Sequence, residues 1–127
     1  MIMDHGTLAY VRDGKMYEGG LFGGDIEEAV HGNAQAEEYA HKYKTGMEAG
    51  FATTMVGVAG LFGGLIVTDL GTESQAGNRA VPVTGLITAG AGLVLYLTGL
   101  FVMLNATPHL YDAVNAYNDS VPPTPAP

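Results

Sequence analysis

Histidine has the widest chemistry of the side chains in this 127-residue chain, which contains His5, His31, His41 and His109. Two of them have glutamates three or four residues earlier: His31 follows Glu27 and Glu28, and His41 follows Glu37 and Glu38. On a helix, this spacing places a carboxylate and an imidazole on one face, where they can bind a metal ion. On an acidic helix such pairs are far more often solvated surface residues, and we favour that interpretation.

Other catalytic side chains are missing or badly placed. Cysteine is absent, which excludes disulfides, thiolate chemistry and cysteine-ligated metals. The only serines, Ser74 and Ser120, lie in expected loops and in no nucleophile-elbow pattern. We therefore expect no catalytic residues, no metal site and no cofactor, and we expect that the protein is not an enzyme.

The elements that would position any site are dominated by two apolar runs, Ala49–Val67 and Val81–Leu104, neither of which contains a charged residue. A helix rises about 1.5 Å per residue and a bilayer core is about 30 Å thick, so about 20 apolar residues cross it. The alternative is a pair of buried helices in a soluble protein, but so short a chain has too little other sequence to cover them. The runs predict an all-α membrane protein whose antiparallel transmembrane helical hairpin spans residues 47–68 and 81–105.

Small residues recur along both runs at seven-residue intervals, which is close to two helical turns. The stripes consist of Gly50, Gly57 and Gly64, with Gly60 beside them, and of Gly85, Gly92 and Gly99, with Ala89 between. Helices in lipid associate by close backbone approach across small side chains. We predict that these eight residues pack the two helices together. The simpler alternative is the general glycine richness of membrane helices.

The other segments carry local structural signals. We expect an extramembrane region at 1–46, with a β-hairpin at 8–17 that turns at Asp13-Gly14 and helices at 25–31 and 34–45. A polar loop is expected at 69–80. Asn105 should end the second span, and Thr107-Pro108 should open a separate amphipathic helix at 107–119. Residues 120–127 are proline-rich and predict a disordered tail.

The net charge of the chain limits the partners that we expect, and the positions of its basic residues indicate its orientation. The formal net charge of −8 argues against nucleic acid as a partner, because nucleic acid is bound by clustered lysine and arginine.

The N-terminus lacks the pattern of a cleavable signal peptide, so the first span should direct insertion. Lys42 and Lys44 precede the first span, whereas Arg79 lies in the loop. The positive-inside rule then places both termini in the cytoplasm, most simply at the cytoplasmic (inner) membrane.

These observations lead to three hypotheses. The first is a non-enzymatic accessory, structural or scaffold subunit that associates with the lipid bilayer and with other membrane subunits or itself, docking through Leu110, Val114 and Tyr117 unless these cap its own N-terminal region. The second is a homo-oligomeric, holin-like pore lined by the threonines Thr53, Thr84, Thr88 and Thr98. The third is a metal-binding enzyme built on His31, His41 and their glutamates.

Overall fold

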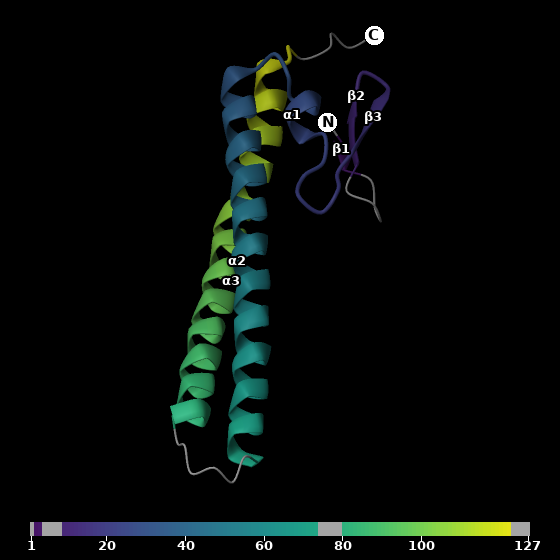
Figure 1. Ribbon diagram of the computed structural model, residues 1–127. Coiled ribbons are helices and arrows are strands. Elements are labelled where there is room, and N and C mark those ends of the chain that lie inside the picture. The colour runs from purple at the N-terminus through teal and green to yellow at the C-terminus, as the bar shows by residue number, and fades with distance from the viewer. Residues whose placement is uncertain (1, 4–8, 74–79, 123–127) are drawn as a thin grey trace. The chain divides into compact units, whose positions relative to one another are not determined.

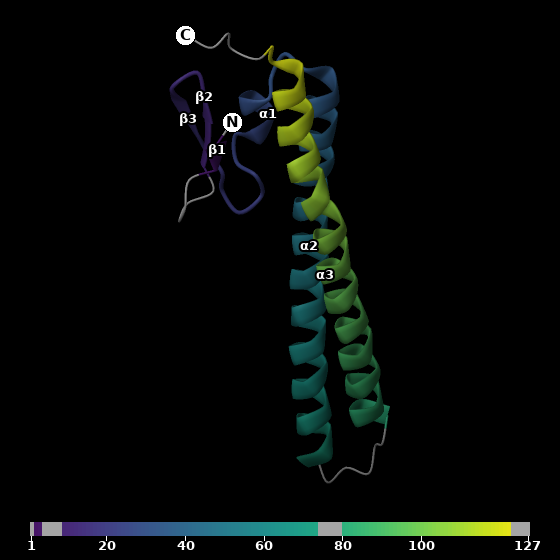
Figure 2. The same cartoon turned by 180° about the vertical axis from the view of Figure 1, so that it is seen from behind.

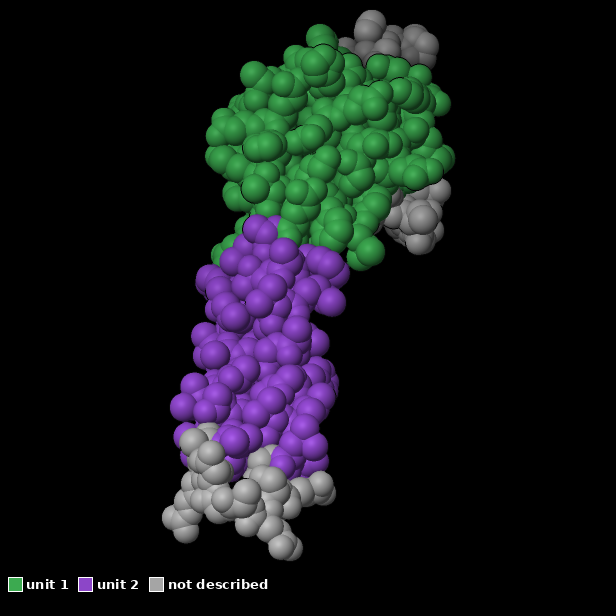
Figure 3. Space-filling view, in the orientation of Figure 1, with its two compact units in different colours: residues 1–48, 104–127 green, residues 49–103 purple. Residues whose placement is uncertain are grey.

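The computed structural model describes residues 2–3, 9–73 and 80–122. The chain is mostly helical and runs in the order β1, β2, β3, α1, α2, α3. It divides into two compact units: unit 1 comprises residues 1–48 and 104–127, and unit 2 comprises residues 49–103. Figure 3 distinguishes the two units by colour.

A small antiparallel sheet lies in unit 1. Strand β2 (Ala9–Arg12) pairs with β3 (Lys15–Glu18), and Tyr10 lies opposite Tyr17 in this register. The predicted hairpin is therefore present, and its turn has φ values of 51° at Asp13 and 77° at Gly14, as an Asp-Gly turn requires. The hairpin prediction missed a third strand, β1 (Ile2–Met3), which pairs with β2 on the side away from β3.

Helix α1 covers only Ile26–Ala29, which is shorter than the helix expected at 25–31. Asp25 stands at its N-cap position, but its side chain caps no helix N–H. Its carboxylate instead accepts a hydrogen bond from the backbone N–H of Glu18, at 3.3 Å. The helix stops early because the chain must turn at Gly32, where φ is +99°, to enter the next helix.

Helix α2 runs without a break over Ala34–Glu73, where we expected a helix at 34–45, a span at 47–68 and a loop from residue 69. Gly46 does not interrupt it. A Cβ atom built on Gly46 would lie 2.6 Å from the Cβ of Ala106, so this glycine permits close approach of a second helix. Among the expected loop residues 69–80, the helix takes up the first five, and 74–79 lie outside the described residues.

Helix α3 covers Ala80–Ser120, with Pro108 inside it. The predicted stop at Asn105 and the new helix at 107–119 are therefore wrong. An internal proline costs about 3 kcal/mol. Continuing the helix keeps Ala106, Leu110 and Ala113 on one face, and all three are buried, which offsets that cost. Of the predicted tail, residues 123–127 lie outside the described residues.

The core of unit 1 is built from strands β2 and β3, the α1 region, and helices α2 and α3. The sheet contributes Tyr10 and Tyr17, and the remaining buried members are Ile26, Ala29 and Val30 from the α1 region, Ala36, Ala40 and Tyr43 from α2, and Ala106, Leu110 and Ala113 from α3. Asn33 joins the helices of this unit: its side chain accepts the N–H of Ala36 as the N-cap of α2 and donates to the carbonyl of Ala116 at 3.1 Å.

Unit 2 consists of two long apolar helical segments that pack against each other. Figures 1 and 2, seen from opposite sides, show α2 and α3 side by side and antiparallel in this unit. Both helices are long and apolar enough to cross a membrane by length and composition.

Candidate functional site

The contact between α2 and α3 in unit 2 is made across glycine. Three pairs face each other reciprocally: Gly50 with Gly99, Gly57 with Gly92, and Gly64 with Gly85. A Cβ atom built on Gly57 would lie 2.8 Å from the carbonyl oxygen of Gly92, and one built on Gly92 would lie 2.7 Å from that of Gly57. Cβ atoms do not approach backbone oxygens so closely, so these positions exclude any side chain. We call the six residues of these three pairs the glycine seam.

The two other predicted packing residues also lie at this contact. Ala89 is buried, with 7% of its surface exposed. Gly60 is less tightly enclosed, because its built Cβ would lie 3.2 Å from the Cα of Gly92. Two further glycines in the same helices, Gly63 and Gly90, have nothing within 4 Å of a built Cβ. The structure thus separates enclosed glycines from open ones within a single pair of helices.

Unit 2 exposes the side chains that a soluble protein buries. In the most apolar stretch of each helix, only 22% of the residues of α2 and 17% of those of α3 are buried. Its exposed side chains include Phe62, Ile66, Leu86, Ile87, Val94 and Phe101, each at least 60% exposed. Core helices of soluble proteins are mostly buried, so these helices do not form such a core within this chain.

Three of the four predicted pore-lining threonines, Thr53, Thr88 and Thr98, donate their hydroxyl protons within their own helices. Thr53 donates to the carbonyl of Ala49 at 2.8 Å, and Thr98 donates to that of Val94 at the same distance. Thr88 donates likewise to Thr84 at 2.9 Å. The hydroxyl protons of these predicted pore-lining residues are therefore directed to the backbone.

Leu110, Val114 and Tyr117, which we expected to dock a partner, pack inside unit 1. Leu110 is 4% exposed and belongs to the core, and the other two are partly buried against it. The guanidinium carbon of Arg12 lies 4.8 Å from the centre of the Tyr117 ring. These contacts match the alternative in which the C-terminal helix covers the protein's own N-terminal region.

Arg12 is a structural residue that sequence analysis missed. One of its guanidinium nitrogens donates to the carbonyl of His31 at 2.8 Å and to that of Ala29 at 3.2 Å. These carbonyls lie at and after the end of α1, where helix carbonyls lack intrahelical partners. Together with the Tyr117 ring, Arg12 thus links strand β2 to the end of α1 and to α3.

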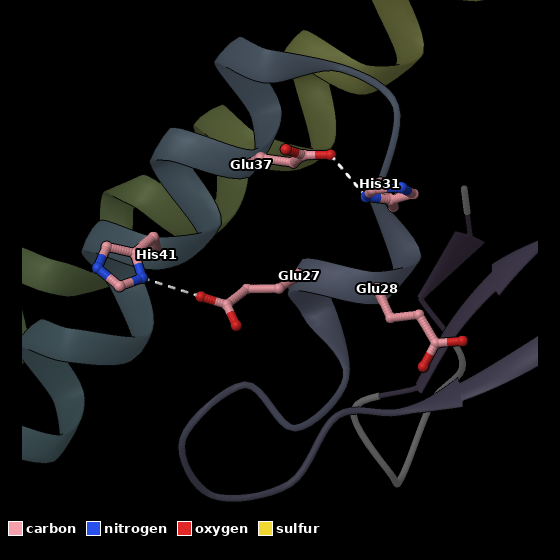
Figure 4. A pocket seen from close by; sticks show the side chains of 5 residues that line it. All are labelled: Glu27, Glu28, His31, Glu37 and His41. Atoms are coloured by element: carbon pink, nitrogen blue, oxygen red, sulfur yellow. Dashed lines mark hydrogen bonds and ion pairs between the residues drawn. The ribbon is translucent and has the colours of Figure 1, made fainter.

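Two histidines and three glutamates line an open depression of unit 1, which Figure 4 shows: Glu27, Glu28, His31, Glu37 and His41. The pairs differ from those we expected. His31 contacts Glu37, with Nδ1 and Oε1 2.8 Å apart, and His41 contacts Glu27 at 3.0 Å. Each pair therefore connects the α1 region to α2 instead of bridging one helical turn.

Among residues 2–3, 9–73 and 80–122, no three histidine, aspartate or glutamate side chains come close enough to hold an ion. The side chains of His31 and His41 are 80% and 74% exposed, so both imidazoles are solvated. His109 lies elsewhere in unit 1, stacked on Tyr39 with ring centres 6.1 Å apart. His5 lies outside the described residues.

Ionisable groups in unit 1 are perturbed by burial and by pairing. Burial, and to a lesser degree the nearby Tyr43, raises the pKa of Tyr10 to about 12. Burial also raises the pKa of Tyr43. On the surface, the hydrogen bond between Lys42 and Glu38 raises the pKa of the lysine and lowers that of the glutamate. None of these shifts places a general acid or base near neutral pH.

Comparison with known proteins identifies no relative. Protein-family models, curated proteins and solved structures all give no match to this chain.

Proposed function

We propose that this protein is a small integral membrane protein without catalytic activity, which acts as an accessory, structural or scaffold subunit of a membrane assembly. Its transmembrane part is the helical hairpin of unit 2. The glycine seam holds the hairpin together, and the outward-facing apolar side chains contact lipid and other subunits, or further copies of this chain.

The observation that carries this proposal is the distribution of side chains in unit 2. Its seam is made of glycine, while phenylalanine, leucine, isoleucine and valine face outward. Exposing contiguous apolar surface to water costs about 25 cal/mol per Å², whereas hydrocarbon imposes no such cost. Helices in lipid pack through small residues that allow close approach. The internal hydrogen bonds of the threonines fit the same environment, in which no water satisfies polar groups.

The chain ends support a hairpin topology. Residues 9–48 and 104–122 belong to one compact unit, which fits two spans that return to the side of the bilayer from which they start. In the sequence, Lys42 and Lys44 precede the first apolar run, and Arg79 falls between the two runs. The positive-inside rule then favours a cytoplasmic unit 1 with both termini, and we propose the cytoplasmic (inner) membrane as the simplest location.

Co-purification tests the scaffold role. The full chain is extracted from native membranes in a gentle detergent, and the proteins recovered with it are identified and their stoichiometry measured. We expect a stoichiometric membrane partner or a defined homo-oligomer. Recovery of the chain alone as a monomer, under conditions that preserve other complexes of the same membrane, would contradict the proposal.

The pore hypothesis is tested by conductance. Thr53, Thr88 and Thr98, three of the four threonines of the predicted lining, donate their hydroxyl protons to their own helices. We expect liposomes that contain the purified protein to remain sealed across a range of potentials. A reproducible single-channel conductance would replace the scaffold proposal by the pore.

A further inference from the structure

The hydroxyl of Tyr96, in helix α3 of unit 2, differs from the threonine hydroxyls of the same unit. Five threonines donate to the carbonyl four residues earlier in their own helix: Thr53, Thr54, Thr68, Thr88 and Thr98. A phenol cannot form this local bond, because its rigid ring holds the hydroxyl away from the helix backbone. The Tyr96 hydroxyl forms no hydrogen bond with any of residues 2–3, 9–73 and 80–122.

The backbone of Tyr96 is held at the glycine seam, while its side chain reaches the surface of unit 2. A Cβ atom built on Gly57 would lie 2.7 Å from the Cα of Tyr96, so α2 and α3 are in close contact at this level. The Tyr96 side chain is only partly buried, and the protein does not enclose its hydroxyl. The hydroxyl is therefore open to whatever surrounds unit 2.

Tyr96 lies deep within the uncharged run of α3. It stands 15 residues after Val81 and 8 residues before Leu104, or about 22 Å and about 12 Å of helix from the two ends of the run. Side chains of a helix lean toward its N-terminus, which turns this phenol away from the nearer end. In a bilayer that covers the run, neither interface is within reach of the hydroxyl, and hydrocarbon offers it no partner.

A second copy of the chain can supply the missing partner. A phenol both donates and accepts a hydrogen bond, so two Tyr96 side chains that meet at a twofold axis satisfy each other. Leu93 and Leu100, three residues before and four residues after Tyr96, share its face of α3 and add apolar contact around the pair. We propose that unit 2 forms a symmetric dimer in the membrane through this face, with the two Tyr96 hydroxyls bonded across the axis. The proposal rests on the membrane role proposed above.

Symmetry favours a second copy over an unrelated helix. A twofold axis along the bilayer normal places both Tyr96 residues at the same depth, so the polar group that each needs is present in the other. An unrelated transmembrane helix would have to carry a polar group at that depth, and such groups are rare and costly inside a membrane.

Energy transfer between labelled copies tests the proposal. Val121→Cys gives one labelling site in the full chain, which contains no cysteine of its own. Copies with a donor or an acceptor dye are reconstituted together into phosphatidylcholine vesicles at several protein-to-lipid ratios. The same measurement is made with Tyr96→Phe, which keeps the ring, and with Thr98→Val as the matched control. Thr98 lies two residues from Tyr96, at nearly the same depth, but its hydroxyl is bonded to the carbonyl of Val94.

The proposal predicts a transfer efficiency that rises linearly with the acceptor fraction, as two-membered complexes require. Tyr96→Phe should raise the dissociation constant by about 3- to 20-fold, the range that interhelical hydrogen bonds contribute in membranes, and Thr98→Val should change it by less than about twofold. Circular dichroism should show the same helix content in all three proteins.

Three results would refute the dimer and leave the proposed function standing: an inserted parent chain that shows no transfer above random proximity, equal dissociation constants for the parent and Tyr96→Phe, or a non-linear dependence that indicates a larger ring. Loss of the parent chain from the vesicles on washing at alkaline pH would refute both the dimer and the proposed function.

Discussion

The two units of this protein bury different kinds of side chain. In unit 1, the interior contains Tyr10, Ile26, Val30 and Leu110, and lysines and glutamates occupy its surface. In unit 2, the buried positions among residues 49–70 and 81–103 are the glycine seam and Ala89, and the large apolar side chains lie outside. Unit 1 therefore has the distribution expected of a protein in water, with large apolar side chains inside and charged side chains on the surface. Unit 2 has the distribution expected where hydrocarbon surrounds the protein and helices gain stability from close approach.

The largest effect is expected at the glycine seam. Gly57→Leu and Gly92→Leu place a side chain where even a Cβ atom meets the backbone of the other helix, so the helices must separate. Overpacking costs about 1–3 kcal/mol in ordinary cores, and we expect more than about 3 kcal/mol against backbone. The measurement is equilibrium unfolding in detergent micelles followed by circular dichroism.

The open glycines of the same helices provide the control for this experiment. Gly63→Leu and Gly90→Leu add the same side chain with nothing within 4 Å of the new Cβ. Both variants should unfold within about 0.5 kcal/mol of the parent protein. Equal effects of Gly57→Leu and Gly63→Leu would remove the distinction between seam and surface, and with it the packing role of the seam.

In unit 1, by contrast, we expect stability to fall when a buried side chain is shortened, not when a side chain is added. Leu110→Ala leaves a cavity in a packed core and should cost about 2–5 kcal/mol. Leu104→Ala is the control, because Leu104 is 71% exposed. Hydrogen exchange in micelles should show reduced protection of unit 1 amides in the first variant only. If Leu110→Ala reduced the protection of amides equally in both units, the two units would not be stabilised separately, which would contradict the comparison.

Arg12 provides a smaller test of how unit 1 is held together. Arg12→Met keeps an apolar stem but removes the donors to the Ala29 and His31 carbonyls and the cation over Tyr117. We expect a loss of about 1–3 kcal/mol in the free energy of unfolding of unit 1. Arg12→Lys should recover only part of it, because an ammonium lacks the fork of donors. Full recovery of the stability by Arg12→Lys would mean that only the positive charge of Arg12 contributes.

The smallest effect concerns Tyr10 and appears only at alkaline pH. Its pKa rises from 10.0 to about 12 on folding, so above pH 10 the unfolded chain releases a proton that the folded chain retains. Its contribution to stability is therefore complete below pH 10 and is lost as pH rises toward 12. Tyr10→Phe should remove this part of the pH dependence.

At neutral pH the same substitution should change stability by less than about 1 kcal/mol, because the buried Tyr10 hydroxyl has no hydrogen-bond partner among the groups that the structure describes. The measurement is denaturant unfolding at several pH values. An unchanged alkaline slope in Tyr10→Phe would show that other groups account for it.

Local signals in the sequence were sufficient for part of the fold. Asp13-Gly14 specified the hairpin turn because both positions need positive φ, and the heptads of glycine indicated the faces that α2 and α3 bring together. Each of these signals is read from a few residues and the period of a helix. The same reasoning placed Gly60 and Ala89 at the contact but could not rank how tightly each position is enclosed.

The features that prediction missed depend on contacts distant in sequence. Pro108 is a strong local stop signal, yet Leu110 and its buried neighbours keep α3 continuous through contacts with segments many residues earlier. Local spacing paired His31 and His41 with glutamates on their own helices, whereas α1 and α2 exchange these partners. Arg12 donates hydrogen bonds to backbone carbonyls 17 and 19 residues away, and no sequence motif predicts these bonds.

Solubility tests the central claim that hydrocarbon surrounds unit 2. The untagged full chain is expressed, its membranes are washed at alkaline pH, and the pellet and supernatant are compared before and after addition of a mild detergent. We predict that the chain remains in the washed pellet and is released only by detergent. Recovery as a folded monomer in the detergent-free supernatant would contradict the account.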